Sequence, residues 1–387
     1  MEEEAVMELK MNQSIPAIIG QRAAANSSAT IMRTKDRGIW KAVSWSDLNA
    51  KVSEIGCALL SADVGRGDVI AILSETRPEA VYADLAVLGC GAASVAIDPD
   101  EDQDRVCHLL SSSGARLAFV ENEEQLDKVL NVRDRCPGLS RVIVFDMKGL
   151  RDFADAGCIS LEDFVKTGHS GGWTDAIRSL EADQPAVIQF PRSEGFGLGR
   201  TLTHSDLMHM VVSARIRLPI QPHDERLAVL RLSDITERVW GLYLGLETGC
   251  ISNYPEGPDT VIENLQELQP TVLGADAAVW AHLHGLATAK AKAATATQRW
   301  AYRWALDGGR LGGAKGQLAN LLVLGAVRRE FGLRRLRLAY VGGAPIGAPA
   351  MDWARCLGIR IQRVDEVSAN AGQVDERYRA LLENAYA

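Results

Sequence analysis

The stretch that decides the fold reads Pro185-Ala-Val-Ile-Gln-Phe-Pro-Arg-Ser-Glu-Gly-Phe-Gly-Leu-Gly-Arg-Thr-Leu-Thr-His204. Its apolar beginning, residues 186–190, predicts a buried strand, and its Thr-His end predicts the start of a helix. Between them stand glycines at positions 195, 197 and 199. Backbone amides in such a loop can form a nest for an anion, and a flexible loop is the alternative interpretation.

The same alternation of strand and helix extends along the chain in both directions. Apolar runs predict strands at 29–32, 41–45, 69–73, 92–97, 117–120, 142–146, 186–190, 227–231, 249–253, 271–273, 336–341 and 359–364. Helical spacing predicts helices at 14–27, 46–62 (capped by Ser46-Asp47), from 78 onward, 105–112, 123–134, 204–216, 236–246, 259–267, 276–288, over most of 289–331, and at 373–385. Strands that alternate with such helices favour an α/β fold of parallel sheets covered by helices.

A polar, glycine-rich passage at about 166–184 is the predicted boundary between two subdomains. The first α/β subdomain would span 1–180, and the second, which carries the glycine loop, would span 181–387. We find no tandem repeat of fixed period.

The charge balance limits the partners that the chain is expected to bind. The net charge is −8 and both signs are interspersed, so a phosphate backbone is not a favoured ligand and we expect no nucleic acid. The acidic N-terminus does not resemble a secretory signal, and no apolar run is long enough to predict a transmembrane segment. We therefore expect a cytoplasmic protein, with peripheral contact to a membrane left open.

The cysteines do not form a recognisable metal or disulfide pattern. There are seven of them, an odd number, and no CxxC pair or cluster of His and Cys occurs. Most lie in apolar runs, which favours buried free thiols in a reducing cytosol and no metal site.

Several longer motifs add to the alternation. They are Lys35-Asp-Arg-Gly-Ile-Trp40, Ser44-Trp-Ser-Asp-Leu48, Val64-Gly-Arg-Gly-Asp-Val-Ile-Ala-Ile-Leu-Ser-Glu-Thr-Arg-Pro-Glu79, Glu124-Gln-Leu-Asp-Lys-Val-Leu130, and the helix-rich passage 300–335 with Arg303-Trp304. From about residue 14 to 372 the chain resembles acyl-CoA synthetases of the adenylate-forming superfamily, in particular the long-chain group. This resemblance implies two helix-flanked, largely parallel sheets packed in αβαβα layers.

The resemblance also implies a chemistry. Family members join a carboxylate to ATP, release pyrophosphate, and transfer the acyl group to coenzyme A. They hold the phosphates with backbone amides, hydroxyls and a lysine, hold Mg²⁺ with a carboxylate, and close a C-terminal lid over the site. The polar helix 375–387 stands where a synthetase would continue, so we expect the lid domain to be absent.

The glycine loop departs from the family pattern Tyr-Thr-Ser-Gly-Thr-Thr-Gly-x-Pro-Lys-Gly. Leu198 stands at the lysine position, Glu194 replaces a hydroxyl, and Pro191 removes an amide. The vestigial cofactor-binding positions here are Ser193, Gly195, Gly199 and Thr203. Arg192 could compensate for the lost cation, although a loop arginine is more often a solvated charge.

Two further motifs have changed as well. In the family's Tyr-Gly-x-Thr-Glu motif, whose Glu binds Mg²⁺, this chain has Asp365 for the aromatic residue, Ser368 for the Thr and Ala369 for the Glu. A register shift of three residues would instead make Glu366 the ligand. The adenine-side loop Gly342-Gly343-Ala344-Pro345 is retained, either for a ligand or as a tight turn.

The stretch from Leu230 to Tyr243 resembles the family's Leu-Pro-Leu-x-His-x-x-Glu-Arg segment, with Asp234 at the His position beside the acyl site. Trp240 and Gly241 could line an acyl site, although aromatic residues at helical spacing are more often core. Glu237-Arg238 is interpreted as a structural ion pair.

These departures predict a catalytically inactive relative of the long-chain acyl-CoA synthetases that acts as a binding or regulatory partner, for example of an active synthetase. We expect no cofactor; ATP, AMP and Mg²⁺ would bind only if the prediction of inactivity is wrong. One alternative is half of a split fatty acid–CoA ligase completed by another chain. The other is a protein that binds an acyl chain or acyl-CoA without turnover.

Overall fold

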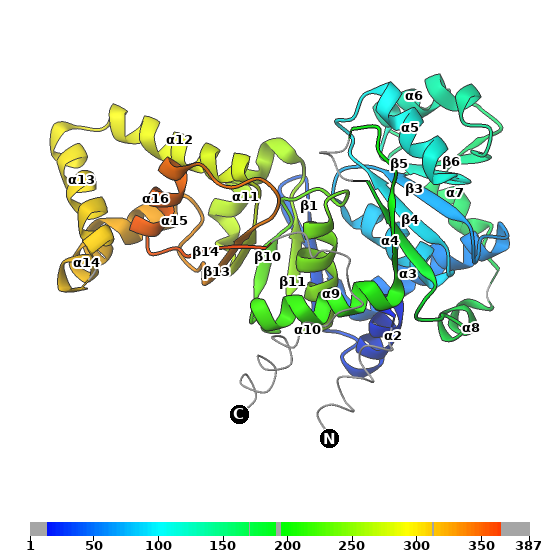
Figure 1. The fold of residues 1–387 in the computed structure, drawn as a ribbon, viewed down its shortest axis with the longest axis horizontal. Helices are drawn as coiled ribbons and strands as arrows, with labels where there is room; N and C mark the ends of the chain where they lie inside the picture. Colours follow the sequence, from blue (N-terminus) through cyan, green and yellow to red (C-terminus); the bar gives the residue numbers. More distant parts are fainter. Residues whose placement is uncertain (1–13, 170, 191–194, 312, 365–387) are drawn as a thin grey trace.

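The computed structural model describes residues 14–169, 171–190, 195–311 and 313–364, and these residues form two seven-stranded sheets flanked by helices (Figure 1). The predicted α/β architecture of two largely parallel sheets is confirmed. Each sheet contains strands from before and from after residue 180 in the sequence. The subdomain boundary near this residue stays a prediction. Among the described residues, no helix is both long and apolar enough to span a membrane.

One sheet has the strand order β7-β6-β5-β3-β4-β8-β9. Its strands are β3 (Val69–Leu73), β4 (Ala93–Ile97), β5 (Leu117–Val120), β6 (Arg141–Val144), β7 (Cys158–Ser160), β8 (Pro185–Gln189) and β9 (Arg200–Thr203). All neighbours are parallel except β8 and β9. The accompanying helices are α3 (Trp45–Ser61), α4 (Pro78–Gly89), α5 (Gln103–Ser113), α6 (Glu123–Val132), α7 (Leu161–Lys166) and α8 (Trp173–Arg178).

The second sheet has the order β14-β13-β12-β10-β11-β1-β2. Its strands are β1 (Thr30–Asp36), β2 (Ile39–Ser44), β10 (Glu225–Leu227), β11 (Ile251–Tyr254), β12 (Val272–Gly274), β13 (Leu338–Val341) and β14 (Ile361–Arg363). Only β1 and β2 pair in an antiparallel manner.

Helical elements surround the second sheet and extend beyond it. They are α2 (Ile15–Ala25), α9 (His204–Arg217), the π-helix η3 (Glu237–Tyr243), α10 (Leu244–Thr248), α11 (Val261–Leu268), α12 (Ala277–Ala293), α13 (Ala296–Leu311), α14 (Gly313–Ala319), the π-helix η5 (Asn320–Leu324), α15 (Gly325–Glu330) and α16 (Ala348–Cys356). Helices α12 to α14 form one end of the molecule in Figure 1.

Local sequence explains why most of these elements form where they do. The strands at the centre of the first sheet are continuous apolar runs, as expected for strands covered on both faces. The predicted cap of α3 was wrong by two residues: Ser44, not Ser46, accepts the backbone N–H of Asp47, and the Asp47 carboxylate accepts the N–H of Ser44. The capping box therefore fixes the first turn from one residue outside the helix.

Other elements were missed by the sequence analysis. Strand β9 is polar and short, and it follows β8 only after the glycine loop, so neither its apolar pattern nor its spacing indicated a hairpin. The elements β7, α7, α8 and α16 were also missed. They are short, with three to nine residues each, and give little periodic signal.

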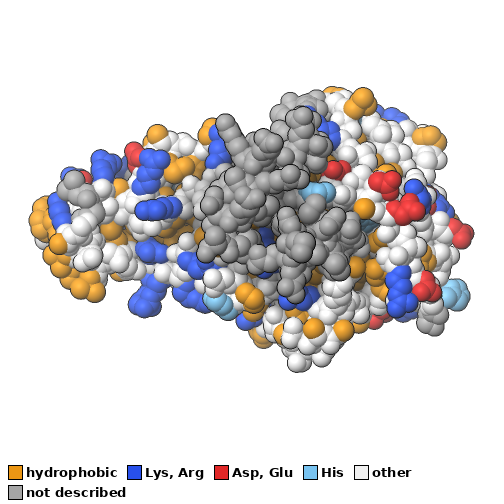
Figure 2. Space-filling view, turned by 60° about the horizontal axis from the view of Figure 1, so that its bottom comes forward, with side chains coloured by type: hydrophobic (Ala, Val, Ile, Leu, Met, Phe, Trp, Pro, Cys, Tyr) orange, Lys and Arg blue, Asp and Glu red, His pale blue; other side chains and the backbone are white. Residues whose placement is uncertain are grey.

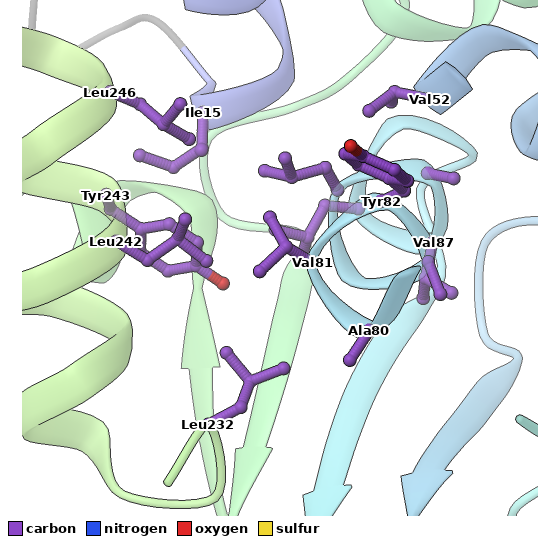
Figure 3. Close-up of a cluster of buried hydrophobic side chains, with 14 of the residues drawn as sticks. Ile15, Val52, Ala80, Val81, Tyr82, Val87, Leu232, Leu242, Tyr243 and Leu246 are labelled. Carbon is purple, nitrogen blue, oxygen red and sulfur yellow. The ribbon is translucent and has the colours of Figure 1, made fainter. Parts of the chain in front are cut away.

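The two sheets are joined through α4 on one side and η3 with α10 on the other. Figure 3 shows Val81 of α4 facing Leu242 and Tyr243 of η3 across this interface. A buried polar network lies beside the apolar contacts. Asp84 accepts hydrogen bonds from Ser94 (2.6 Å), Arg238 (2.5 Å) and the Tyr243 hydroxyl (2.7 Å). Removing one member of a buried charge pair leaves the other charge buried without a partner, which costs free energy. This network therefore favours one relative position of the two sheets.

Candidate functional site

A cleft of about 1630 Å³ lies where the strands of both sheets end. The loops that line it follow β3 (Thr76), β4 (Asp98), β8 (Phe190), β10 (Leu230) and β13 (Gly343). The carboxyl edge of a parallel sheet is the usual place for a ligand, because the loops there are free to vary while the strands hold them in place. This cleft is therefore the candidate site.

The lining of the cleft is strongly acidic. Of the residues that the structure describes, twelve Asp and Glu line it, against five Lys and Arg. The acidic residues are Asp36, Glu75, Glu79, Asp98, Asp100, Glu101, Glu121, Asp146, Asp234, Glu256, Asp259 and Asp276, and the basic ones are Lys35, Lys41, Arg77, Arg105 and Arg231. A cleft with low-dielectric walls concentrates such a charge, so its potential is negative and unfavourable for a polyanion.

Arg231 crosses the cleft from one sheet to the other. It follows β10, and its guanidinium pairs with Glu75, which follows β3, and with Asp100, which follows β4, at 2.8 Å. The buried Asp98 lies 3.9 Å away. The sequence analysis did not single out Arg231. The available signal was an arginine at the proline position of the Leu-Pro-Leu-x-His pattern.

The glycine loop is attached to helix α5. Arg105 donates to the carbonyl oxygen of Gly195, and the ring of His108 lies within hydrogen-bonding distance, 3.1 Å, of the Gly197 carbonyl. The Phe196 ring lies beside both side chains. One carbonyl oxygen of this loop thus contacts a guanidinium of α5, and a second lies beside an imidazole nitrogen of the same helix.

The described residues at the predicted phosphate-binding positions are either exposed or packed against other parts of this chain. Leu198, at the lysine position, is 81% exposed. Gly199 packs against Ile188 and Phe190, where a Cβ atom would lie 2.6 and 2.8 Å from their side chains. The Thr203 hydroxyl accepts from the Asp206 N–H (3.1 Å) and donates to its carboxylate (2.8 Å), which caps α9.

His204, the residue after this cap, is buried at the start of α9. Burial lowers the pKa of its imidazole to about 4. Neither ring nitrogen has a hydrogen-bond partner among the described residues. The neutral ring is therefore the form that the fold accommodates.

The adenine-side loop borders the cleft. Gly342, Gly343 and Ala344 line it directly, and Pro345 is exposed next to them. A Cβ atom on Gly342 would lie 2.2 Å from the Thr236 hydroxyl oxygen, so glycine is needed there for packing. Gly343 has a φ of +66° and open space around its Cα, a backbone conformation that favours glycine in a turn.

The central segment is divided between the cleft and the core. Asp234 lines the cleft, and its carboxylate accepts the Thr236 N–H at 2.7 Å. Trp240 is buried within η3. A Cβ atom on Gly241 would lie 2.3 Å from the Arg226 guanidinium. Their assignment to an acyl site stays a prediction.

Glu237 and Arg238 form ion pairs with other residues than the sequence analysis indicated. Glu237 and Arg238 do not pair with each other. Glu237 pairs with Arg226 of β10, and Arg238 pairs with Asp84 of α4. Both pairs are fully buried and link separate elements, so their role in this fold is structural.

Several predicted positions lie outside the described residues: Pro191, Arg192, Ser193, Glu194, Asp365, Glu366, Ser368, Ala369 and the helix at 373–385. Within the part of the chain that the structure describes, no group of three or more His, Cys, Asp or Glu side chains is placed to hold a metal ion. All seven cysteines are free thiols; Cys57 and Cys158 are half-buried and the other five are buried.

Comparison with known proteins places this fold and cleft in a family. The family model described as AMP-binding enzyme matches residues 20–366. The chain belongs to this family, as its motifs indicated. Among curated relatives it is similar to the long-chain-fatty-acid–CoA ligase FadD15 of Mycobacterium bovis (24% identical; 94% of this chain and 62% of that protein). It is also similar to fatty acyl-CoA synthetase A of Dictyostelium discoideum (23% identical; 88% and 52%).

Solved structures with low sequence identity share the fold. The A-PCP didomain of a carboxylic acid reductase from Segniliparus rugosus, in complex with AMP, aligns with a TM-score of 0.70 (15% identical; 94% of this chain, 54% of that one). The N-terminal domain of FACL13 from Mycobacterium tuberculosis aligns with a TM-score of 0.66 (14% identical; 92% and 76%). The chain thus spans less than two thirds of the length of the curated relatives named above.

Proposed function

We propose that this chain is an acyl-CoA ligase-like protein that does not form acyl-adenylates itself and acts as a binding or regulatory partner. The observation that supports the proposal is the charge of the cleft, with twelve carboxylates against five Lys and Arg among its described lining residues. MgATP keeps a net negative charge. Moving it into a negative cleft costs electrostatic free energy that a synthetase would offset with cations and hydroxyls on the phosphates.

Among the described positions, the side chains expected to offset this cost are uncharged or engaged in other contacts. Leu198 carries no charge, and the Thr203 hydroxyl is engaged in capping α9. Arg231, which follows a strand of one sheet, is engaged by carboxylates that follow strands of the other. Losing one oriented charged contact in a transition state costs about 3 kcal/mol, so these changes together favour loss of adenylation.

The direct test is isothermal titration of the purified chain with MgATP, followed by a pyrophosphate-release assay with long-chain fatty acids. An active long-chain acyl-CoA ligase, measured in parallel, shows that the assays work. We expect no heat of binding at millimolar MgATP and no pyrophosphate above the blank. Saturable MgATP binding with fatty-acid-dependent pyrophosphate release would overturn the proposal.

A second measurement separates electrostatic exclusion from loss of the site. In the triple variant Asp100→Asn, Asp146→Asn and Asp259→Asn, three cleft carboxylates become amides of similar size. If charge excludes the nucleotide, the variant binds MgATP measurably more tightly than the unsubstituted chain. An unchanged titration would show that charge is not the cause.

The proposed partner role has its own test. The chain is mixed with an active acyl-CoA ligase, and acyl-CoA formation is compared with that of the ligase alone. A changed rate supports a regulatory partner. Acyl-CoA formed only when this chain is added to an otherwise inactive protein would instead assign it to a split ligase. The proposal includes a cytoplasmic location. Binding of fatty acyl-CoA without turnover is tested by a separate titration of the chain with a long-chain acyl-CoA.

A further inference from the structure

The helical arm at one end of the molecule, residues 277–330, differs in charge from the rest of the chain. The arm comprises α12, α13, α14, η5 and α15. It carries eight Lys and Arg against two acidic residues, within a chain of net charge −8. The cations are Lys290, Lys292, Arg299, Arg303, Arg310, Lys315, Arg328 and Arg329, and the acidic residues are Asp307 and Glu330.

The same arm exposes large apolar side chains. Trp300 on α13 is 68% exposed, Leu318 on α14 is 48% exposed, and Leu321 and Leu322 on η5 are 80% and 61% exposed. Helix α13 packs against both α14 and η5, so the four side chains belong to one helical hairpin. Figure 2 shows Lys and Arg side chains gathered at this end, with hydrophobic side chains at its tip. Apolar side chains grouped in this way mark an interaction surface more often than single exposed ones do.

A basic groove of about 550 Å³ lies between α12, α13 and α16. Lys292, Arg299, Arg303 and Arg310 line it, together with Asp307 and Asp352. Arg299 donates to backbone carbonyl oxygens of the α12 end, and Asp352 lies 3.5 Å from Arg355. Among the described residues, Lys292, Arg303 and Arg310 form no ion pair with a carboxylate.

We propose that this arm docks on the surface of an anionic lipid membrane. Leu321, Leu322 and Trp300 would enter the boundary between headgroups and acyl chains, and the cations of the arm would bind anionic headgroups. Two features of the arm favour this occupant: its positive charge complements an anionic bilayer, and helices that combine cations with Trp and Leu bind in the plane of a membrane interface. The inference goes beyond the proposed function because it concerns a surface away from the cleft.

The test is co-sedimentation of the purified full chain with vesicles. One set contains phosphatidylcholine alone, and the other is an equal mixture of phosphatidylcholine and phosphatidylglycerol. We expect binding to the mixed vesicles and little to the neutral ones. Binding should weaken when NaCl rises from about 0.1 M to about 0.5 M, because salt screens exposed charges.

Two pairs of substitutions separate the apolar and charged contributions. Leu321→Asp with Leu322→Asp should lower vesicle affinity by about tenfold or more, because two exposed leucines no longer leave water. Arg303→Gln with Arg310→Gln should lower it several-fold and reduce the salt dependence. Circular dichroism checks that each variant folds, which we expect because all four side chains lie on the surface.

Matched controls lie far from the arm. Ile39→Asp replaces an apolar side chain, 66% exposed, on β2, which is at the other edge of the same sheet from β14. Arg66→Gln with Arg178→Gln removes two exposed cations and changes the net charge by the same amount as the arm variant. Neither should change vesicle binding.

Four results would overturn the inference. They are absence of binding to either vesicle, equal binding to both, unchanged binding of the leucine variant, and complete competition by inorganic phosphate at matched ionic strength. Dimerisation in the absence of lipid that the leucine substitutions abolish would assign the surface to a second copy of the chain, and would also contradict membrane docking.

Discussion

Leu198 and Arg231 stand at the positions that the sequence alone aligns with a lysine and a proline of the family patterns. The Leu198 side chain is exposed to solvent, and the Arg231 guanidinium, which follows a strand of one sheet, lies among carboxylates that follow strands of the other. Neither change affects the strands that carry the loops. We expect differences of this kind to alter what the cleft can bind while leaving the fold in place, because function depends on the site more than on the scaffold.

His204 gives a prediction at the scale of one residue. Burial lowers the pKa of its imidazole in the native state to about 4, from 6.5 as the ordinary value. Between these two pH values the unfolded chain binds a proton that the native state excludes, so stability falls as pH falls through this window and is unaffected above it. We expect this group to reduce the free energy of unfolding by about 2 kcal/mol between pH 7 and pH 5.

The measurement is urea unfolding of the unsubstituted chain and of His204→Met at both pH values. The variant should lose about that much less stability on acidification. His223→Gln, at an exposed histidine, is the control and should follow the unsubstituted chain. Identical losses in the chain with and without His204 would mean that the imidazole is protonated in the folded state.

At the scale of an element, α9 depends on its N-terminal capping box. Thr203 and Asp206 exchange hydrogen bonds there, and the buried His204 is the first helical residue between them. Thr203, which the family resemblance assigned to cofactor binding, thus caps the helix through its contacts with Asp206. A threonine hydroxyl in this position satisfies a backbone N–H that the helix leaves without an acceptor.

We therefore predict that Thr203→Ala destabilises the fold by about 1 kcal/mol, while Thr203→Ser retains most of the stability because serine caps equally well. Thermal or urea unfolding of the two variants measures the difference. Thr201→Ala is a suitable control, since Thr201 is exposed on the same strand, β9. Equal stability of the alanine and serine variants at position 203 would argue against the cap.

At the scale of the whole molecule, charge is divided between two regions. Carboxylates outnumber Lys and Arg among the described charged residues that line the cleft, whereas cations outnumber carboxylates on the helical arm. The chain's net charge of −8 hides this division. Because steering of charged ligands depends on local potential, the two regions should attract ligands of opposite sign.

Arg231 contributes to the joining of the two sheets across this cleft. The substitution Arg231→Gln removes the cation that is shared by Glu75, Asp100 and the buried Asp98. We expect a loss of about 2 kcal/mol in the free energy of unfolding, between the small values of surface pairs and the larger ones of buried pairs. Urea unfolding at pH 7 measures it.

Arg66→Gln is the matched control, because Arg66 pairs with Glu181 in an exposed position and should cost less than about 1 kcal/mol. If both variants lose the same small amount, the contacts across the cleft contribute little to the stability of the fold.

Much of the fold could be predicted from the sequence because several elements are specified locally. The apolar runs at β3 and β5, the proline that opens α4 and the continuous alternation along the chain predicted helix-covered parallel strands, and the family resemblance implied that they form two sheets. The cap of α3 was placed two residues late, because Ser44 and Ser46 are both suitable residues and only backbone geometry distinguishes them. Strand β9 was missed because its residues become a strand only by pairing with β8.

The sequence by itself determined the family and predicted that Leu198 stands at the lysine position of its pattern, since motifs and residue types can be read without coordinates. Only the tertiary structure decided the sign of the cleft, the position of Arg231 between two sheets and the gathering of apolar and basic side chains on one arm. The physical reason is that these properties depend on side chains distant in sequence, such as Asp100 and Arg231, that become neighbours only when both sheets have formed.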